Sequence, residues 1–139
     1  MLSTESERFL VTGTVCRGRQ LLEEQFLLVE DGSIVATGHK NDIPDSFTGK
    51  VYSFPEQYTI APGFIDVHIH GANGADTMDA TTECLDIMAR TLPKEGTTSF
   101  LPTTMTQAPE KIGAALKNAA EYMQNNNRIG QAEIVGIHL

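Results

Sequence analysis

Two histidines separated by one residue, His68 and His70, are the side chains in this sequence best suited to chemistry. They end the apolar segment Phe64–His70, whose β-branched and aromatic residues predict a strand. Because residues two apart on a strand point to the same side, both imidazoles can approach one metal ion. Imidazole suits zinc, iron, nickel and similar cations, so the pair predicts a metal site without naming the metal.

A bare His-x-His motif also arises by chance in strands that bind no metal. Here the motif is followed directly by Gly-Ala-Asn-Gly, a flexible segment that suits the close approach of a ligand. Asp66 lies on the same side of the strand as His68 by the same alternation. Its carboxylate could hold a histidine ring N–H, or it could bond to nearby backbone, which is the interpretation we favour.

A β-α-β-α-β order surrounds the histidines. Strands alternating with helices pair in parallel through crossovers, and this order starts either a doubly wound sheet or a (β/α)8 barrel. Apolar residues at helical spacing predict helices over 80–95 and from about Pro109 to the polar run 124–128. The predicted strands are 64–70, Thr97–Leu101 and Glu133–His138.

The first third of the sequence predicts β-structure. Arg8–Arg17 reads as one strand, and Gln25–Gly38 reads as two strands joined at Asp31-Gly32. That dipeptide between apolar runs is a strong hairpin signal. Residues 44–55 are broken by prolines and glycine and predict a loop. Short antiparallel strands of this kind indicate a small β-sandwich or a piece of one.

The amino-acid composition limits the kinds of partner that the protein can bind. The 139 residues carry a net charge of −8, and Lys and Arg are scattered along the chain. Because nucleic-acid binding needs a concentrated positive surface, we expect neither a nucleic-acid nor a membrane partner. No apolar run could span a bilayer, and the N-terminal MLSTESERF lacks the pattern of a signal peptide. With two isolated cysteines, Cys16 and Cys84, these features predict a cytoplasmic protein.

The segment Ala61–His70, Ala-Pro-Gly-Phe-Ile-Asp-Val-His-Ile-His, resembles the entry into the barrel of the amidohydrolase superfamily. Three further segments, Gly74–Ala80, Glu95–Thr104 and Val135–Leu139, resemble the N-acetylglucosamine-6-phosphate deacetylases within that superfamily. The resemblance implies an α/β fold, the start of a (β/α)8 (TIM-type) barrel preceded by part of a small β-sandwich domain. It places the sandwich portion at residues 1–60 and the first β-α-β-α-β portion of the barrel at 61–139.

The resemblance also implies the chemistry. Members of this family hydrolyse the acetamide of N-acetylglucosamine 6-phosphate to glucosamine 6-phosphate and acetate with a metal-activated water. His68 and His70 match the family's metal-binding His-x-His. The implied cofactor is a divalent ion, zinc or iron, with one or two ions bound. The implied partners are a small phosphosugar substrate and, at full length, further copies of the same chain.

Other functional residues are expected outside this sequence. His138-Leu139 match the start of a motif that continues Glu-Gly-Pro, in which the glutamate is a metal ligand and the histidine is structural. The general base, an aspartate, and the phosphate-binding residues are expected beyond Leu139. No catalytic or substrate-binding residue is therefore assigned within the chain. We expect it to be an inactive N-terminal fragment that unfolds with little cooperativity on its own.

Two alternatives stay open. Another amidohydrolase, similar to a dihydroorotase or hydantoinase, would share His-x-His but act on a cyclic amide. The chain could instead be a natural short form that acts as a non-catalytic interaction module. Among the remaining polar residues, His39 is expected to be exposed. Thr97, Thr98, Thr103 and Thr104 could line a pocket, although strand propensity explains them equally well.

Overall fold

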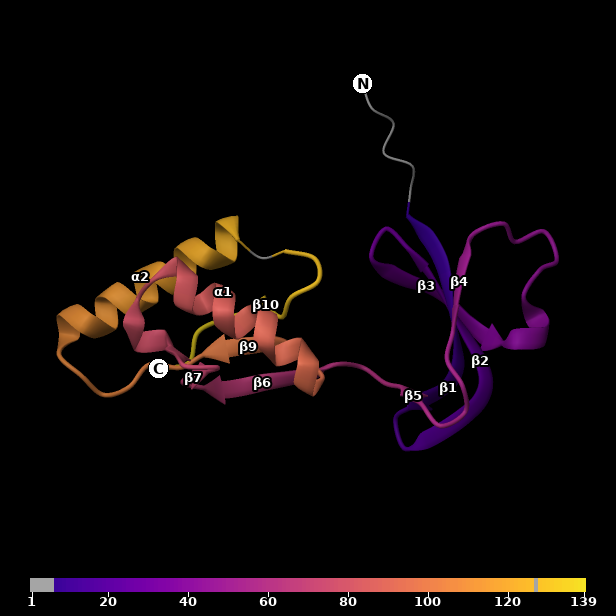
Figure 1. Ribbon diagram of the computed structural model, residues 1–139, viewed down its shortest axis with the longest axis horizontal. Coiled ribbons are helices and arrows are strands. Elements are labelled where there is room, and N and C mark those ends of the chain that lie inside the picture. Colours follow the sequence, from indigo (N-terminus) through magenta and orange to yellow (C-terminus); the bar gives the residue numbers. More distant parts are fainter. Residues whose placement is uncertain (1–6, 127) are drawn as a thin grey trace, which may run out of the picture. The chain divides into compact units, whose positions relative to one another are not determined.

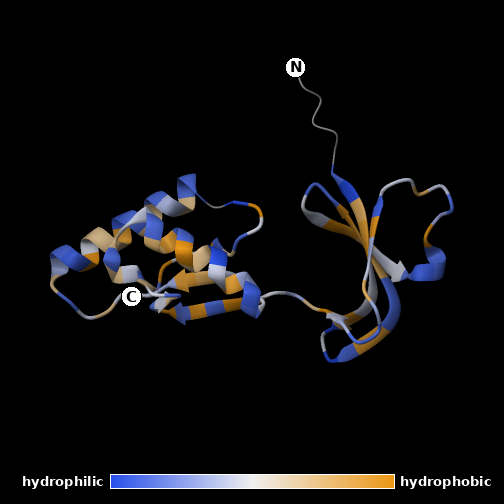
Figure 2. Cartoon of the chain, in the orientation of Figure 1, coloured by the Kyte–Doolittle hydropathy of each residue, from blue (hydrophilic) through white to orange (hydrophobic). Residues whose placement is uncertain are grey.

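The computed structural model describes residues 7–126 and 128–139. Residues 1–6, which begin the N-terminal segment, and residue 127, within the predicted helix-ending run, lie outside the described residues. The chain divides into two compact units, Met1–Pro62 and Gly63–Leu139. Each unit carries its own sheet, and apolar residues run along the strands of both (Figures 1 and 2).

The first unit is a five-stranded sheet in the order β3-β2-β1-β4, with β5 also paired to β1. The hairpin at Asp31-Gly32 is confirmed, because both residues have the positive φ angles, 49° and 77°, of a tight two-residue turn. The elements are β1 (Arg8–Arg17), β2 (Gln20–Glu30), β3 (Ser33–His39), the 3-10 helix η1 (Lys40–Asp42), β4 (Lys50–Ser53) and β5 (Thr59–Ile60).

Two expectations for the first unit were incomplete. The strands β4 and β5 run parallel to β1, so the sheet is mixed rather than wholly antiparallel. The connection 40–49 carries the chain back across the sheet before β4 begins, which permits this parallel pairing. The strand β2 also begins at Gln20, five residues before the predicted start, because Glu23 and Glu24 interrupt its apolar pattern while its first residues pair with β1.

The second unit has the predicted β-α-β-α-β order, and its sheet β10-β9-β6 is parallel. Figure 1 shows both helices on one side of this sheet. The elements are β6 (Phe64–Ile69), β7 (Gly71–Ala72), β8 (Ala75–Asp76), η2 (Thr77–Asp79), α1 (Thr82–Thr91), η3 (Leu92–Glu95), β9 (Thr97–Pro102), α2 (Pro109–Asn125) and β10 (Glu133–Ile134).

The helix predicted over 80–95 is shorter than expected, because Pro93 ends its regular part. Proline has no N–H, so it cannot donate to the carbonyl of Ala89 four residues earlier. The N–H of Ala132 donates to that carbonyl instead, at 2.8 Å. This bond ties the chain before β10 to α1. The hydroxyl of Thr81 caps the start of the helix by accepting from the N–H of Cys84.

The core of the second unit lies between its helices and its sheet. Leu85, Met88 and Ala89 of α1 meet Phe100 of β9, and all four are fully buried. Ala119 and Tyr122 of α2 complete this core with Ile134 of β10. Within the described part of the chain, no helix is long and apolar enough to cross a membrane.

Candidate metal centre

The His-x-His pair lies at the carboxyl end of the first strand of the second unit. His68 is in β6 and His70 follows the last residue of that strand. The Nε2 atoms of the two rings are 3.3 Å apart, and the rings meet edge to face with centroids separated by 5.1 Å. The two imidazoles therefore converge on one point, as residues two apart on a strand can do.

The ring of His70 is oriented by the strand beside it. Its Nδ1 lies 3.1 Å from the carbonyl oxygen of Thr103, which directly follows β9. A carbonyl oxygen can only accept, so Nδ1 carries the proton of the neutral ring. Nε2 is then the nitrogen with a free lone pair, and it is the atom directed at His68. A backbone carbonyl that holds the non-ligating nitrogen is the usual support of a metal-binding histidine.

The spacing of the two Nε2 atoms fits a shared cation. Zinc–imidazole bonds of about 2.0–2.1 Å at a tetrahedral angle place two nitrogens about 3.3–3.4 Å apart. The observed separation is 3.3 Å. His68 is exposed and His70 is half-buried, so an ion can reach both from solvent. Both the donor type and the geometry of this pair therefore suit a divalent metal.

Asp66 does not hold a histidine ring through any contact in the structure. Its Oδ1 accepts the backbone N–H of His68 at 3.1 Å, a local bond two residues along the chain. Of the two interpretations open from the sequence, the bond to nearby backbone is confirmed. Asp66 therefore stabilises the backbone that carries His68.

His138 joins the two histidines, although the sequence indicated no contact with them. Its ring lies 4.4 Å from that of His68, centroid to centroid, and its Nδ1 donates to the carbonyl of Val67 at 2.8 Å. The sequence could have predicted that His138 lies near His68, because strands of one parallel sheet bring their carboxyl ends to the same edge. This hydrogen bond attaches the segment after β10 to β6, so the role of His138 here is structural.

The described residues bring together a pair of candidate ligands. Within residues 7–126 and 128–139, no group of three or more His, Cys, Asp or Glu side chains is placed to hold a metal ion. A catalytic zinc site usually has three protein ligands. His39, expected to be exposed, is half-buried in the first unit, where its ring caps η1 by accepting from the N–H of Asn41.

The Gly-Ala-Asn-Gly segment after His70 is more ordered than a flexible loop. It forms the small hairpin β7–β8, with Asn73 and Gly74 at positive φ angles of 52° and 81°. The carbonyl of His70 accepts the N–H of Thr77, which follows this hairpin, at 2.7 Å. This hydrogen bond attaches the chain that follows the hairpin to the backbone of the second histidine.

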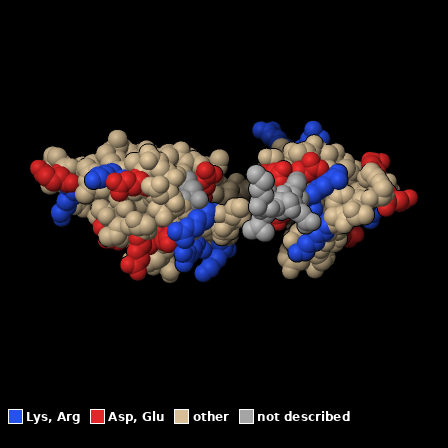
Figure 3. All heavy atoms as spheres, turned by 90° about the horizontal axis from the view of Figure 1, so that it is seen from above, with Lys and Arg blue, Asp and Glu red and all other residues tan. Residues whose placement is uncertain are grey.

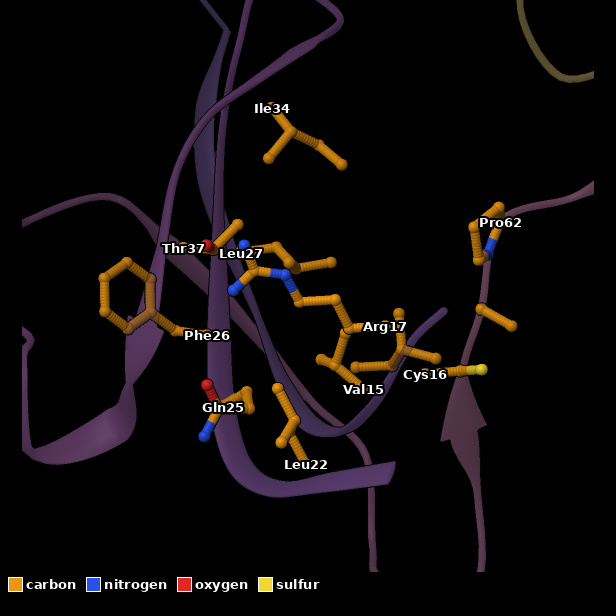
Figure 4. A pocket seen from close by; sticks show the side chains of 12 residues that line it. Val15, Cys16, Arg17, Leu22, Gln25, Phe26, Leu27, Ile34, Thr37 and Pro62 are labelled. Atoms are coloured by element: carbon orange, nitrogen blue, oxygen red, sulfur yellow. The ribbon is translucent and has the colours of Figure 1, made fainter. Parts of the chain in front are cut away.

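A separate hollow of about 370 Å³ occurs in the first unit, and its lining is mainly apolar. Figure 4 shows Val15, Leu22, Leu27 and Ile34 around it. All of its lining residues belong to the first unit, so it is not part of the histidine site. Figure 3 shows acidic and basic side chains next to one another on the visible face of each unit.

The second unit is a parallel β-α-β-α-β unit with paired histidines at the carboxyl end of its first strand. Residues 59–133 match the model of the Amidohydrolase family, and the chain belongs to this family.

Comparison with individual proteins shows which members of the family the chain is similar to. N-acetylglucosamine-6-phosphate deacetylase of Bacillus subtilis (strain 168) is 42% identical over 122 residues, which are 86% of this chain and 30% of the relative. N-acetylgalactosamine-6-phosphate deacetylase of Escherichia coli O157:H7 is 35% identical over 131 residues, 90% of this chain and 32% of the relative.

Solved structures agree with these relatives. The crystal structure of N-acetylglucosamine-6-phosphate deacetylase from Pasteurella multocida matches with a TM-score of 0.79 at 25% identity, over 94% of this chain and 33% of that chain. The chain thus spans about a third of the length of the relatives that it matches.

Proposed function

We propose that this chain is part of an N-acetylglucosamine-6-phosphate deacetylase. The complete enzyme would hydrolyse the acetamide of N-acetylglucosamine 6-phosphate to acetate and glucosamine 6-phosphate. The observation that carries this proposal is the match to a deacetylase of that name at 42% identity over 86% of the chain. The converging histidine pair adds support, because an amide hydrolase of this family needs a metal site.

Each of the two units can be assigned to a domain of such an enzyme. We assign residues 61–139 to the first β-α-β-α-β portion of a (β/α)8 barrel, and residues 1–60 to part of a β-sandwich domain. The sequential order β6, β9, β10 in a parallel sheet supports the barrel, in which each strand pairs with the next along the chain. His68 and His70 then lie at the carboxyl end of a barrel strand, the end at which barrel enzymes place their active sites.

His68 and His70 would hold the metal through Nε2, and the ion we expect is zinc or iron. When bound, a divalent cation supplies Lewis acidity, which polarises a carbonyl and makes water a better nucleophile. His70 keeps its proton on Nδ1, where the Thr103 carbonyl accepts it, so this ring contributes a lone pair rather than a proton. Asp66 holds the backbone of His68.

The remaining functions would come from the rest of the enzyme. We place the other metal ligands, the aspartate general base and the phosphate-binding groups in the two thirds of the relatives' length that this chain does not match. The complete protein would act on a small phosphosugar and form homo-oligomers.

A second substrate has a specific observation in its favour. The relative from Escherichia coli O157:H7 is named for N-acetylgalactosamine 6-phosphate, which differs from the glucosamine compound only at one hydroxyl-bearing carbon of the ring. Its lower identity, 35% against 42%, favours the glucosamine substrate for this chain.

The test is a comparison of substrates by kcat/KM. The protein expressed from the complete open reading frame that contains these 139 residues is assayed with both N-acetylhexosamine 6-phosphates and with dihydroorotate. We expect the highest kcat/KM for N-acetylglucosamine 6-phosphate. A preference for the galactosamine compound would replace the substrate, a preference for dihydroorotate would assign a cyclic-amide hydrolase, and no hydrolysis would favour an interaction module.

A further inference from the structure

Thr103 makes more contacts with the end of the histidine strand than its place in the sequence suggests. It is 2% exposed and directly follows β9. Its hydroxyl accepts the N–H of Ile69 at 3.0 Å and donates to the carbonyl of Leu101 at 3.1 Å. Its own N–H donates to the carbonyl of Ile69 at 2.8 Å. Thr103 therefore binds both polar backbone groups of the residue between the two histidines.

The Thr103 hydroxyl replaces a backbone hydrogen bond that is missing between β6 and β9. The register of β6 against β9 is irregular between Asp66 and Ile69, the stretch that contains His68. An N–H that loses its ladder partner must find another acceptor. The side chain of Thr103 supplies that acceptor to Ile69, so the irregular end of β6 stays attached to β9.

The same residue also holds the second histidine. The carbonyl of Thr103 receives the Nδ1 proton of His70, and this contact leaves Nε2 directed at His68. A hydroxyl that fixes Ile69 and a carbonyl that fixes His70 act on adjacent residues. If the hydroxyl is removed, the strand end can shift away from β9 and lengthen the bond to the His70 ring.

We propose that Thr103 is a positioning residue for the metal-binding histidines, whose side-chain hydroxyl keeps His70 in the tautomer that presents Nε2 to a divalent cation. This inference rests on the metal site of the proposed function. It adds one residue to that site and a requirement for the hydroxyl that neither strand propensity nor packing demands.

The test uses zinc alone as the probe and the protein expressed from the complete open reading frame that contains these 139 residues. Thr103→Val removes the hydroxyl at nearly constant shape, and Thr103→Ser retains it. Thr77→Val is the matched control. Thr77 is 1% exposed and binds the carbonyl of His70 only through its backbone, and its hydroxyl has no hydrogen-bond partner among the described residues. Zinc affinity is measured by competition with a chromogenic chelator, and the protonated nitrogen of His70 by long-range ¹⁵N NMR.

We expect the original chain to carry the His70 proton on Nδ1. Thr103→Val should bind zinc about 10–100-fold more weakly, the range for loss of an outer-shell partner, with a mixture of His70 tautomers. Thr103→Ser and Thr77→Val should retain both properties.

A proton on Nε2 of His70 in the original chain would overturn the inference, whether or not any variant folds. So would full zinc affinity with an unchanged tautomer in Thr103→Val. If the original chain binds no zinc, the proposed metal site fails, and the tautomer measurement still decides the role of Thr103.

Discussion

His70 has a separate partner for each ring nitrogen, the carbonyl of Thr103 at Nδ1 and the ring of His68 at Nε2. Replacing it by glutamine removes the imidazole and breaks the convergence. We expect His70→Gln to lower zinc affinity by more than the roughly 10–100-fold that an outer-shell loss costs. Isothermal titration calorimetry measures this affinity. His39→Gln in the first unit is the control, and an unchanged affinity in His70→Gln would contradict the site.

Tyr122 contributes a polar hydroxyl to the otherwise apolar core of the second unit. Its side chain is 1% exposed, its hydroxyl donates to Asp86 of α1 at 2.6 Å, and it accepts from Gln131 at 2.9 Å. Burial, and then the hydrogen bond and negative charge of Asp86, raise the pKa of Tyr122 to about 12 from an ordinary value of 10.0. The folded chain therefore favours the neutral phenol.

We expect Tyr122→Phe to lower the free energy of unfolding by about 1.5–3 kcal/mol at pH 7, the worth of a hydrogen bond to a charged group. Because the folded pKa is raised, the stability from the neutral phenol is complete below pH 10 and is lost as pH rises towards 12. The difference between the two chains should therefore shrink above pH 10. Urea unfolding of the protein from the complete open reading frame at several pH values measures it, and a difference near zero at pH 7 would contradict the role of this bond.

At the scale of elements, the sequence predicted those with a strong periodic or turn signal. β1 was placed at the observed residues and the Asp31-Gly32 hairpin is present. The element boundaries that were predicted wrongly have physical causes. The apolar spacing of residues 80–95 continues through Pro93, although proline has no N–H to extend the helix. Glu23 and Glu24 interrupt the apolar pattern of β2, whose first residues are ordered by pairing with β1. At the site, alternation predicted that His68 and His70 converge, but the contacts of Thr103 and His138 depend on the register between strands.

Two glycines of the second unit should respond oppositely to alanine. Gly74 has a φ of 81° in the β7–β8 turn, so a Cβ there is strained although the space is open. Gly113 lies in α2 with open space around it and ordinary helical backbone. We expect Gly74→Ala to destabilise by about 1–2 kcal/mol and Gly113→Ala to stabilise by about 0.5–1 kcal/mol. Urea midpoints of the protein from the complete open reading frame measure both, and equal shifts would contradict the assigned turn.

At the scale of the whole molecule, much apolar surface is exposed. Phe64, Ile65 and Val67 of β6 are between 60% and 70% exposed, although parallel strands are usually buried on both faces. We expect the 139-residue chain by itself to unfold over a broad temperature range or to self-associate. Calorimetry with sedimentation measures this behaviour. A sharp two-state transition of a monomer would contradict the expectation.

The proposed function makes these residues part of a metal-dependent deacetylase of an amino-sugar phosphate. The most direct test is acetate release from N-acetylglucosamine 6-phosphate by the protein from the complete open reading frame, before and after treatment with a chelator. We expect acetate release that is lost on chelation and restored by zinc or iron(II). Absence of release, or release that chelation leaves unchanged, would contradict it.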